Sequence, residues 1–126
     1  MEKLILVAAG GAVGSAARYL AGIQASRFGA AWPYGTFAVN LVGGLLMGLL
    51  AGYLAHRGGA DQERLRVLLG VGVLGGFTTF SAFSLEMALM IEKRAYGQAF
   101  SYGLFSVALS VAALFAGLML ARRIFA

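Results

Sequence analysis

The chain has 126 residues, of which 60% are hydrophobic and 12% charged, and its mean hydropathy is +0.83. A soluble domain is about 45–50% apolar and about 25% charged, so this chain has too little polar surface to be one, and a helical membrane protein is predicted. The absence of cysteine excludes disulfides and thiolate metal sites. The net charge of +5 is typical of the basic flanks of membrane helices, and no nucleic-acid partner is predicted.

Four membrane helices are predicted in one domain, residues 1–126, because each span needs about 20 residues. The first apolar run continues past Arg18 without a small-residue cleavage site. It is therefore interpreted as a retained helix rather than a signal peptide. The expected helices cover 3–24, 34–55, 65–91 with a break at 75–79, and 96–120.

The first helix carries a stripe of small residues that ends in a charge. Gly10, Gly14, Arg18 and Gly22 recur every four residues and so share one face. Small residues at this spacing let a neighbouring helix approach closely. Two readings of Arg18 stay open, because an arginine there can reach the membrane interface or attract anions to the mouth of a pathway.

The second helix carries two polar residues near its start. Thr36 and Asn40 lie about one turn apart and face the same way. An asparagine in an apolar helix needs partners. It is either a clasp between helices, worth on the order of 1 kcal/mol, or an amide donor that faces a pore.

The third helix is interrupted by the stretch GGFTTFSAFS, residues 75–84. Irregular backbone inside a membrane survives only where it is buried in protein or lines a watery cavity. This stretch is therefore predicted to be a break that forms a site. If the helix restarts near Phe80, four side chains share an arc of about 160°, and Ala82 points the opposite way. The four are Phe80, Ser81, Phe83 and Ser84.

That arc suits a small anion. Ring edges are positive and serine hydroxyls donate hydrogen bonds, so both favour an anion without holding it tightly. Carbonyls of an unwound turn before the arc suit an alkali cation. Glu86 lies at the edge of the arc, either as a relay or vestibule carboxylate or paired with Lys93 or Arg94.

The fourth helix carries a hydroxyl at every fourth residue. Single hydroxyls in membrane helices often bond their own helix, but three in line favour a lined pathway. These residues are Tyr102, Ser106 and Ser110.

The charges orient the chain weakly. Four spans put both termini and the loop 56–66 on one side, with six lysines and arginines against three or four on the other. A chain with so small a bias can insert both ways and pair antiparallel with itself. Four helices are also few to enclose a pathway, so a homodimer is predicted.

Three motifs resemble the Fluc (CrcB) family of fluoride channels over nearly the whole chain. They are GGAVGSAARY at 10–19, GTFAVNLVGG at 35–44 and GVLGGFTTFSAFSLE at 72–86. The resemblance implies an antiparallel dual-topology homodimer with two pores, in the plasma (cell inner) membrane. It implies passive export of cytoplasmic fluoride, which would reduce fluoride toxicity.

The resemblance also implies roles for single residues. Phe80 and Phe83 would form an aromatic box, and Asn40 would be the pore amide. The carbonyls of Gly75 and Thr78 would hold a structural Na⁺ at the dimer centre. Ala82 departs from the family, where threonine is frequent. Other implied pore residues are Arg18, Thr36, Thr79, Ser81, Ser84, Glu86, Tyr102, Ser106 and Ser110.

Three other classes fit less well. A small dual-topology multidrug exporter needs a carboxylate embedded in its first helix, where this chain has only Glu2 at the extreme end. An assembly protein leaves the polar break unexplained. An enzyme is not predicted, because the sequence has no carboxylate dyad, no Ser-His-Asp set and no phosphate-binding motif.

Overall fold

The computed structural model describes residues 1–29 and 32–126, and the described part of the chain is helical with no strand. Four helical segments in this part are long and apolar enough to cross a membrane, which confirms the predicted all-α membrane class. The segments are Glu2–Phe28, Tyr34–Arg57, Gln62–Glu92 and Tyr96–Phe125. The predicted spans lie within these bounds, and the fourth helix runs five residues further than expected, to Phe125 rather than 120.

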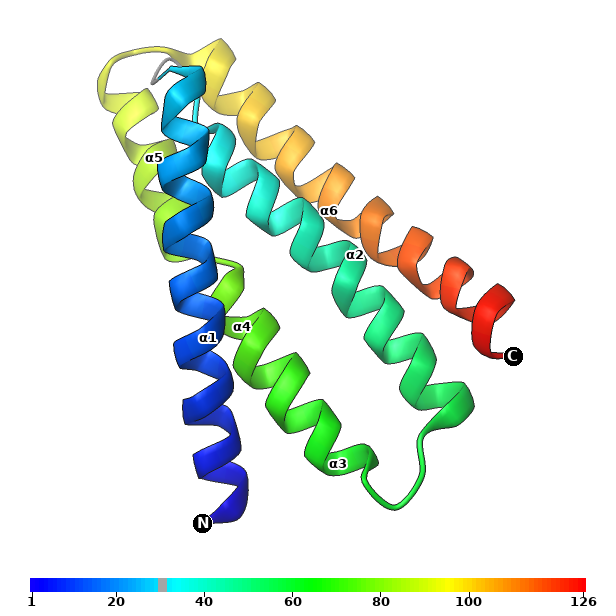
Figure 1. The fold of residues 1–126 in the computed structure, drawn as a ribbon. Coiled ribbons are helices and arrows are strands. Elements are labelled where there is room, and N and C mark those ends of the chain that lie inside the picture. The colour runs from blue at the N-terminus through cyan, green and yellow to red at the C-terminus, as the bar shows by residue number, and fades with distance from the viewer. Residues whose placement is uncertain (30–31) are drawn as a thin grey trace.

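Figure 1 shows two pairs of helices. In the first pair, α1 (Glu2–Ala25) crosses the lower half of the third segment. In the second, α2 (Tyr34–Arg57) runs beside α6 (Tyr96–Phe125). A short 3₁₀ turn, η1 (Ser26–Phe28), extends α1. The third segment is composite. It consists of α3 (Gln62–Leu65), the π-helical η2 (Arg66–Leu74), α4 (Gly75–Phe77) and α5 (Ser81–Glu92).

Glycines set the distance between the paired helices. A Cβ added at Gly48 would collide with the carbonyl oxygen of Leu114, and one added at Gly44 would lie 2.8 Å from that of Ser110. Thus α2 and α6 meet backbone to backbone. Large apolar side chains instead point outward over most of the surface, for example Leu4, Leu20, Phe100 and Phe115. Lipid is as apolar as these side chains, so close packing rather than hydrophobic burial holds the helices together.

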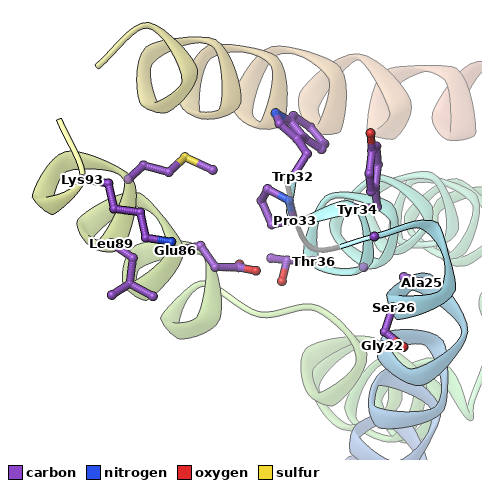
Figure 2. Close-up of a pocket in the computed structure, with 13 residues that line it drawn as sticks. Gly22, Ala25, Ser26, Trp32, Pro33, Tyr34, Thr36, Glu86, Leu89 and Lys93 are labelled. Carbon is purple, nitrogen blue, oxygen red and sulfur yellow. The ribbon is translucent and has the colours of Figure 1, made fainter. Parts of the chain in front are cut away.

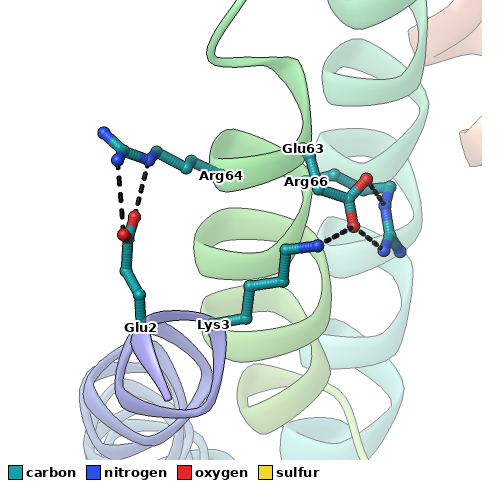
Figure 3. A network of polar contacts seen from close by, with 5 residues as sticks. All are labelled: Glu2, Lys3, Glu63, Arg64 and Arg66. Carbon is teal, nitrogen blue, oxygen red and sulfur yellow. Dashed lines mark hydrogen bonds and ion pairs between the residues drawn. The ribbon is translucent and has the colours of Figure 1, made fainter.

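Polar contacts gather the N-terminus and the α2–α3 loop at one end of the molecule. Arg64 pairs with Glu2 at 2.6 Å, and Glu63 pairs with Arg66 at 2.6 Å and with Lys3 at 3.9 Å (Figure 3). All five side chains are about half or more exposed, so these pairs are screened by solvent and contribute little to stability.

The same end also holds the C-terminus. Arg57 at the end of α2 donates from Nε to the Phe125 carbonyl at 2.8 Å. Both termini and the second loop therefore share a side, as predicted.

The helical spiral is interrupted later than predicted. Gly75 and Gly76 remain helical in α4, and the non-helical residues are 78–80 rather than 75–79. Gly76 serves packing instead, because a Cβ there would lie 2.8 Å from the Gly11 carbonyl of α1. The chain leaves the helix at Thr78, which is extended (φ −85°, ψ 161°), and α5 begins at Ser81.

Candidate functional site

The first half of the third segment ends on a double hydrogen bond. Both the amide and the hydroxyl of Thr78 donate to the Leu74 carbonyl, at 3.0 Å each. A threonine that bonds back four residues supplies the helix with one more donor while the backbone turns away. Thr78 therefore closes α4, and the residues after it are free to take another direction.

Asn40 of α2 binds the backbone on the other side of this turn. Its Nδ2 donates to the Thr79 carbonyl at 3.0 Å, and its Oδ1 accepts from the Thr79 amide at 2.8 Å. One amide side chain thus satisfies both backbone groups of a non-helical residue, as a neighbouring strand would. The amide keeps one N–H and one lone pair for a further partner. Of the two readings of Asn40, the structure shows the clasp directly.

Arg18 of α1 reaches the same turn from the opposite side. Its Nε donates to the Gly76 carbonyl at 3.1 Å. Among the described residues, the Gly75, Phe77 and Thr78 carbonyls accept no hydrogen bond, whereas those of Leu74, Gly76 and Thr79 are all occupied.

These free carbonyls fit a hard cation. Alkali and alkaline-earth ions take neutral and anionic oxygen ligands, and an interrupted membrane helix commonly supplies them as carbonyls. Gly75 and Thr78, which the resemblance assigns to Na⁺, are both among the free ones. The described residues contain no group of three His, Cys, Asp or Glu side chains that could hold a metal ion. Any cation at this position would therefore depend on backbone oxygens.

Thr79 starts the second half. Its hydroxyl accepts from the Ala82 amide at 3.1 Å and lies 3.3 Å from the Ser81 hydroxyl. This bond satisfies one of the free amides in the first turn of α5. Ser81 and Ser84 are exposed on that turn.

The two phenylalanines of the predicted arc lie together. The Phe80 and Phe83 ring centroids are 5.6 Å apart with a 41° angle between the planes. Both line a cleft of about 370 Å³ between the third segment, α2 and α6. Ala82 lines a different cleft, together with Arg18 and Thr79, so it faces away from the rings as the helical arc predicts.

Two hydroxyls of α6 face the rings. Ser106 and Ser110 line the same cleft as Phe80 and Phe83, and their Oγ atoms are buried without a hydrogen-bond partner among the described residues. Buried polar atoms are nearly always paired in folded proteins. Two unpaired hydroxyls in one cleft are therefore available to a ligand.

Tyr102, the third hydroxyl residue predicted on α6, does not line this cleft. It is fully buried, and its hydroxyl donates to Glu86 Oε1 at 3.2 Å. Figure 2 shows Glu86, Thr36 and Lys93 around a second cleft of about 360 Å³, near the C-terminal end of α1 and the N-terminal end of α2. Glu86 forms no ion pair with Lys93 or Arg94 within 4 Å in the described part of the chain, so the paired reading of this carboxylate is not supported.

A chain of aromatic rings joins the two clefts. Trp32 stacks edge-on against Tyr102 at 5.1 Å, and Tyr102 lies 5.1 Å from Phe83. The sequence did not predict this contact. No local pattern reveals it, because the two residues are far apart in the sequence, one just before α2 and the other in α6. Most of the predicted site residues thus line three neighbouring clefts, with Thr36 shared by two of them and Thr79 by two. Four predicted residues line none of the three, namely Gly75, Ser81, Ser84 and Tyr102.

This fold and site define a multi-pass membrane protein whose polar groups gather where the third span is interrupted. A family model described as "CrcB-like protein, Camphor Resistance (CrcB)" matches residues 5–118. The chain belongs to the CrcB family, which comprises ion channels rather than enzymes.

Curated relatives cover the chain from end to end, and each is named "Fluoride-specific ion channel FluC". The relative from Caulobacter sp. (strain K31) is 77% identical over 99% of this chain and 98% of its own length. The one from Phenylobacterium zucineum (strain HLK1) is 74% identical over 100% of both chains. The one from Agrobacterium fabrum is 49% identical over 99% of this chain and 100% of its own.

Proposed function

We propose that the protein is a fluoride-selective channel that exports cytoplasmic fluoride passively across the plasma (cell inner) membrane. The observation that carries this proposal is the cleft in which the unpaired Ser106 and Ser110 hydroxyls face the Phe80 and Phe83 rings. Hydroxyls that no protein group satisfies are ready donors for an anion. The names of the relatives identify that anion as fluoride.

The route we propose begins at the cleft of Glu86 and Thr36 and passes Asn40 and Thr79. It then continues between the rings and the α6 hydroxyls. The positive ring edges and the hydroxyl protons replace the ion's water one contact at a time. Each contact is weak, so the ion leaves each position as readily as it enters. Tyr102 positions Glu86 at the entrance through their hydrogen bond, and exposed Ser81 and Ser84 supply further hydroxyls.

We also propose an antiparallel homodimer with two pores. Phe80 is 76% exposed, and the cleft that it lines is open on one side. A second copy would supply the missing wall, and twofold symmetry would generate a second route. The charge bias of six against three or four is small enough for the chain to insert in both orientations.

A structural Na⁺ at the centre of this dimer completes the proposal. The Gly75 and Thr78 carbonyls would hold it, since no described residue donates a hydrogen bond to either of them. When bound, the ion neutralises the carbonyl ends of the two interrupted helices. Replacing Na⁺ by N-methylglucamine should lower the thermal unfolding temperature of the purified protein as well as the fluoride flux. Equal unfolding temperatures in both buffers would contradict the cation site.

The exporter alternative is less well supported. The only acid of α1 is Glu2, and it lies at the exposed end of the helix in an ion pair with Arg64. It is therefore outside the part of the helix where proton exchange with a cationic drug would occur.

Ion efflux from liposomes tests the channel function. Purified protein in sodium-containing vesicles should release fluoride rapidly and chloride hardly at all. Protein-free vesicles are the control for leakage. Equal release of both ions, or release of neither, would contradict the proposal.

A further inference from the structure

Arg18 stands at the end of a close helix contact. A Cβ at Gly14, one turn earlier on α1, would collide with the Val73 carbonyl oxygen. A Cβ at Gly76 would lie 2.8 Å from the Gly11 carbonyl oxygen. Glycines on both sides thus bring α1 and the first half of the third segment together backbone to backbone. The next residue on this α1 face is Arg18, which therefore meets the third segment where α4 ends.

The end of α4 needs what an arginine offers. Residues 62–77 form one continuous helical run, and the last carbonyls of a helix lack partners within it. These carbonyls also carry the negative end of the helix dipole. The Arg18 Nε–H satisfies one of them, that of Gly76, at 3.1 Å and brings a positive charge to the same point. In a membrane no water can satisfy a free carbonyl, so this bond stabilises the backbone more there than at a wet surface.

We propose that Arg18 is a positioning residue that caps the C-terminal end of α4 and so fixes the helix interruption. It holds the backbone just before Thr78, while Asn40 holds the backbone just after it. With Gly76 and Thr79 fixed, the carbonyls between them have one arrangement instead of many. Arg18 also removes the Gly76 carbonyl from the oxygens open to a cation, which leaves those of Gly75, Phe77 and Thr78.

This role differs from the attraction of anions to a pore mouth. An anion-attracting arginine acts through its charge on the fluoride concentration at the mouth, so its loss raises the concentration that half-saturates flux. A positioning arginine acts through the geometry of residues 76–79. Its loss loosens that backbone and lowers the maximal flux, while the fluoride concentration that half-saturates flux stays the same.

Hydrogen exchange of the full-length protein measures the backbone directly. The Thr78 and Thr79 amides are both hydrogen-bonded, so their exchange is slow as long as the interruption keeps its shape. Arg18→Gln should speed exchange of these amides about tenfold or more, because a charged hydrogen bond is lost. Exchange in α6 should not change. Arg27→Gln is the matched control, since it removes the same charge from exposed η1, away from the interruption.

Arg18→Lys should restore part of the protection. Lysine keeps the charge but cannot place a donor at the Nε position. If Arg18→Gln does not accumulate in membranes, Arg18→Lys carries the test alone, with exchange of the Thr78 and Thr79 amides faster than in the native protein. Native exchange in every Arg18 variant that folds would overturn the proposal.

Flux measurements give a second readout, which rests on the proposed channel function. Arg18→Gln should lower the maximal fluoride efflux about tenfold and leave the half-saturating fluoride concentration unchanged. A raised half-saturating concentration with native amide exchange would assign Arg18 to anion attraction and overturn the positioning role. If the native protein moves no fluoride, the channel proposal fails, but the exchange experiment still decides the role of Arg18.

Discussion

At the scale of single residues, the candidate pore wall combines side chains that add little to the stability of one chain. Phe80 is 76% exposed, and the Ser106 and Ser110 hydroxyls are buried without partners. A folded protein gains little from an exposed ring and loses free energy on an unpaired buried hydroxyl. Residues that add little to the stability of the fold, or lower it, are candidates for function, and these three line one cleft.

Phe80→Ile and Phe83→Ile should each lower fluoride efflux at least about tenfold, because isoleucine has no positive ring edge to offer an anion. The Phe80 variant should keep its dimer and its unfolding temperature, since the ring is mostly exposed in one chain. Efflux from liposomes and size-exclusion chromatography measure both properties. Phe100→Ile is the matched control, because Phe100 is 71% exposed on α6 and lines none of the three clefts. Native efflux in both variants would remove the rings from the pathway.

Ser110→Ala should separate function from stability. Removing an unpaired buried hydroxyl relieves a desolvation cost of about 1–3 kcal/mol, so the variant should be as stable as the native protein or more so. Its fluoride efflux should nevertheless fall. Thermal unfolding and liposome efflux measure the two effects, with Ser101→Ala on the same helix as the control. A clear loss of stability would show that the hydroxyl is paired within the protein.

At the scale of elements, the third segment is shaped by its contacts with α1 and α2. Glycines let α1 lie against η2 and α4, and Arg18 and Asn40 bind the backbone on each side of Thr78. Gly76 of the interruption motif therefore serves close packing, while side chains from other helices satisfy backbone groups of Gly76 and Thr79. Arg18 and Asn40 thus supply hydrogen-bond partners for part of the interrupted backbone, which at membrane depth has no water to bond.

Two glycines on adjacent turns of α1 should respond differently to alanine. Gly14→Ala places a methyl group against the Val73 carbonyl oxygen, so α1 must move away from η2. We expect a loss of about 2 kcal/mol or more in stability. Gly11→Ala meets nothing within 4 Å and should be neutral or slightly stabilising, because alanine favours helices by about 1 kcal/mol over glycine. Unfolding in detergent measures both, and equal effects would contradict the packing of α1 on η2.

At the scale of the whole molecule, the two ends differ little in charge. Three of the six cations at the end with the termini, Lys3, Arg64 and Arg66, pair with Glu2 or Glu63. Arg18 lies at the helix interruption, so the other end retains Arg27, Lys93 and Arg94. So weak a difference accords with the proposed insertion in both orientations.

Thiol labelling tests this orientation, since the native chain has no cysteine. Gly59→Cys and Gly97→Cys lie at opposite ends of the helices, and a side chain at either position meets nothing within 4 Å. A membrane-impermeant reagent applied from outside the cell should label about half of each variant. The cysteine-free protein is the control. Complete labelling at one position and none at the other would establish a single orientation.

Much of the fold follows from the sequence alone. Hydropathy is a local property, so the four spans are readable from composition along the chain, and their ends differ by only a few residues. The period of a helix is also local, and it places Phe80 beside Phe83 and turns Ala82 away from them. The gathering of hydroxyls at the interruption needs no tertiary information either.

The tertiary structure decided what these local patterns leave open. The interruption falls at 78–80 rather than 75–79, and Gly76 instead packs within a helical turn against α1. The Arg18 side chain donates to the carbonyl of a residue 58 positions away, and the Asn40 side chain bonds the backbone of a residue 39 positions away. No local sequence pattern predicts either contact. The sequence by itself determined which residues are polar and which face they share. Only the packing of helices distant in sequence determined which oxygens are satisfied and which remain free for an ion.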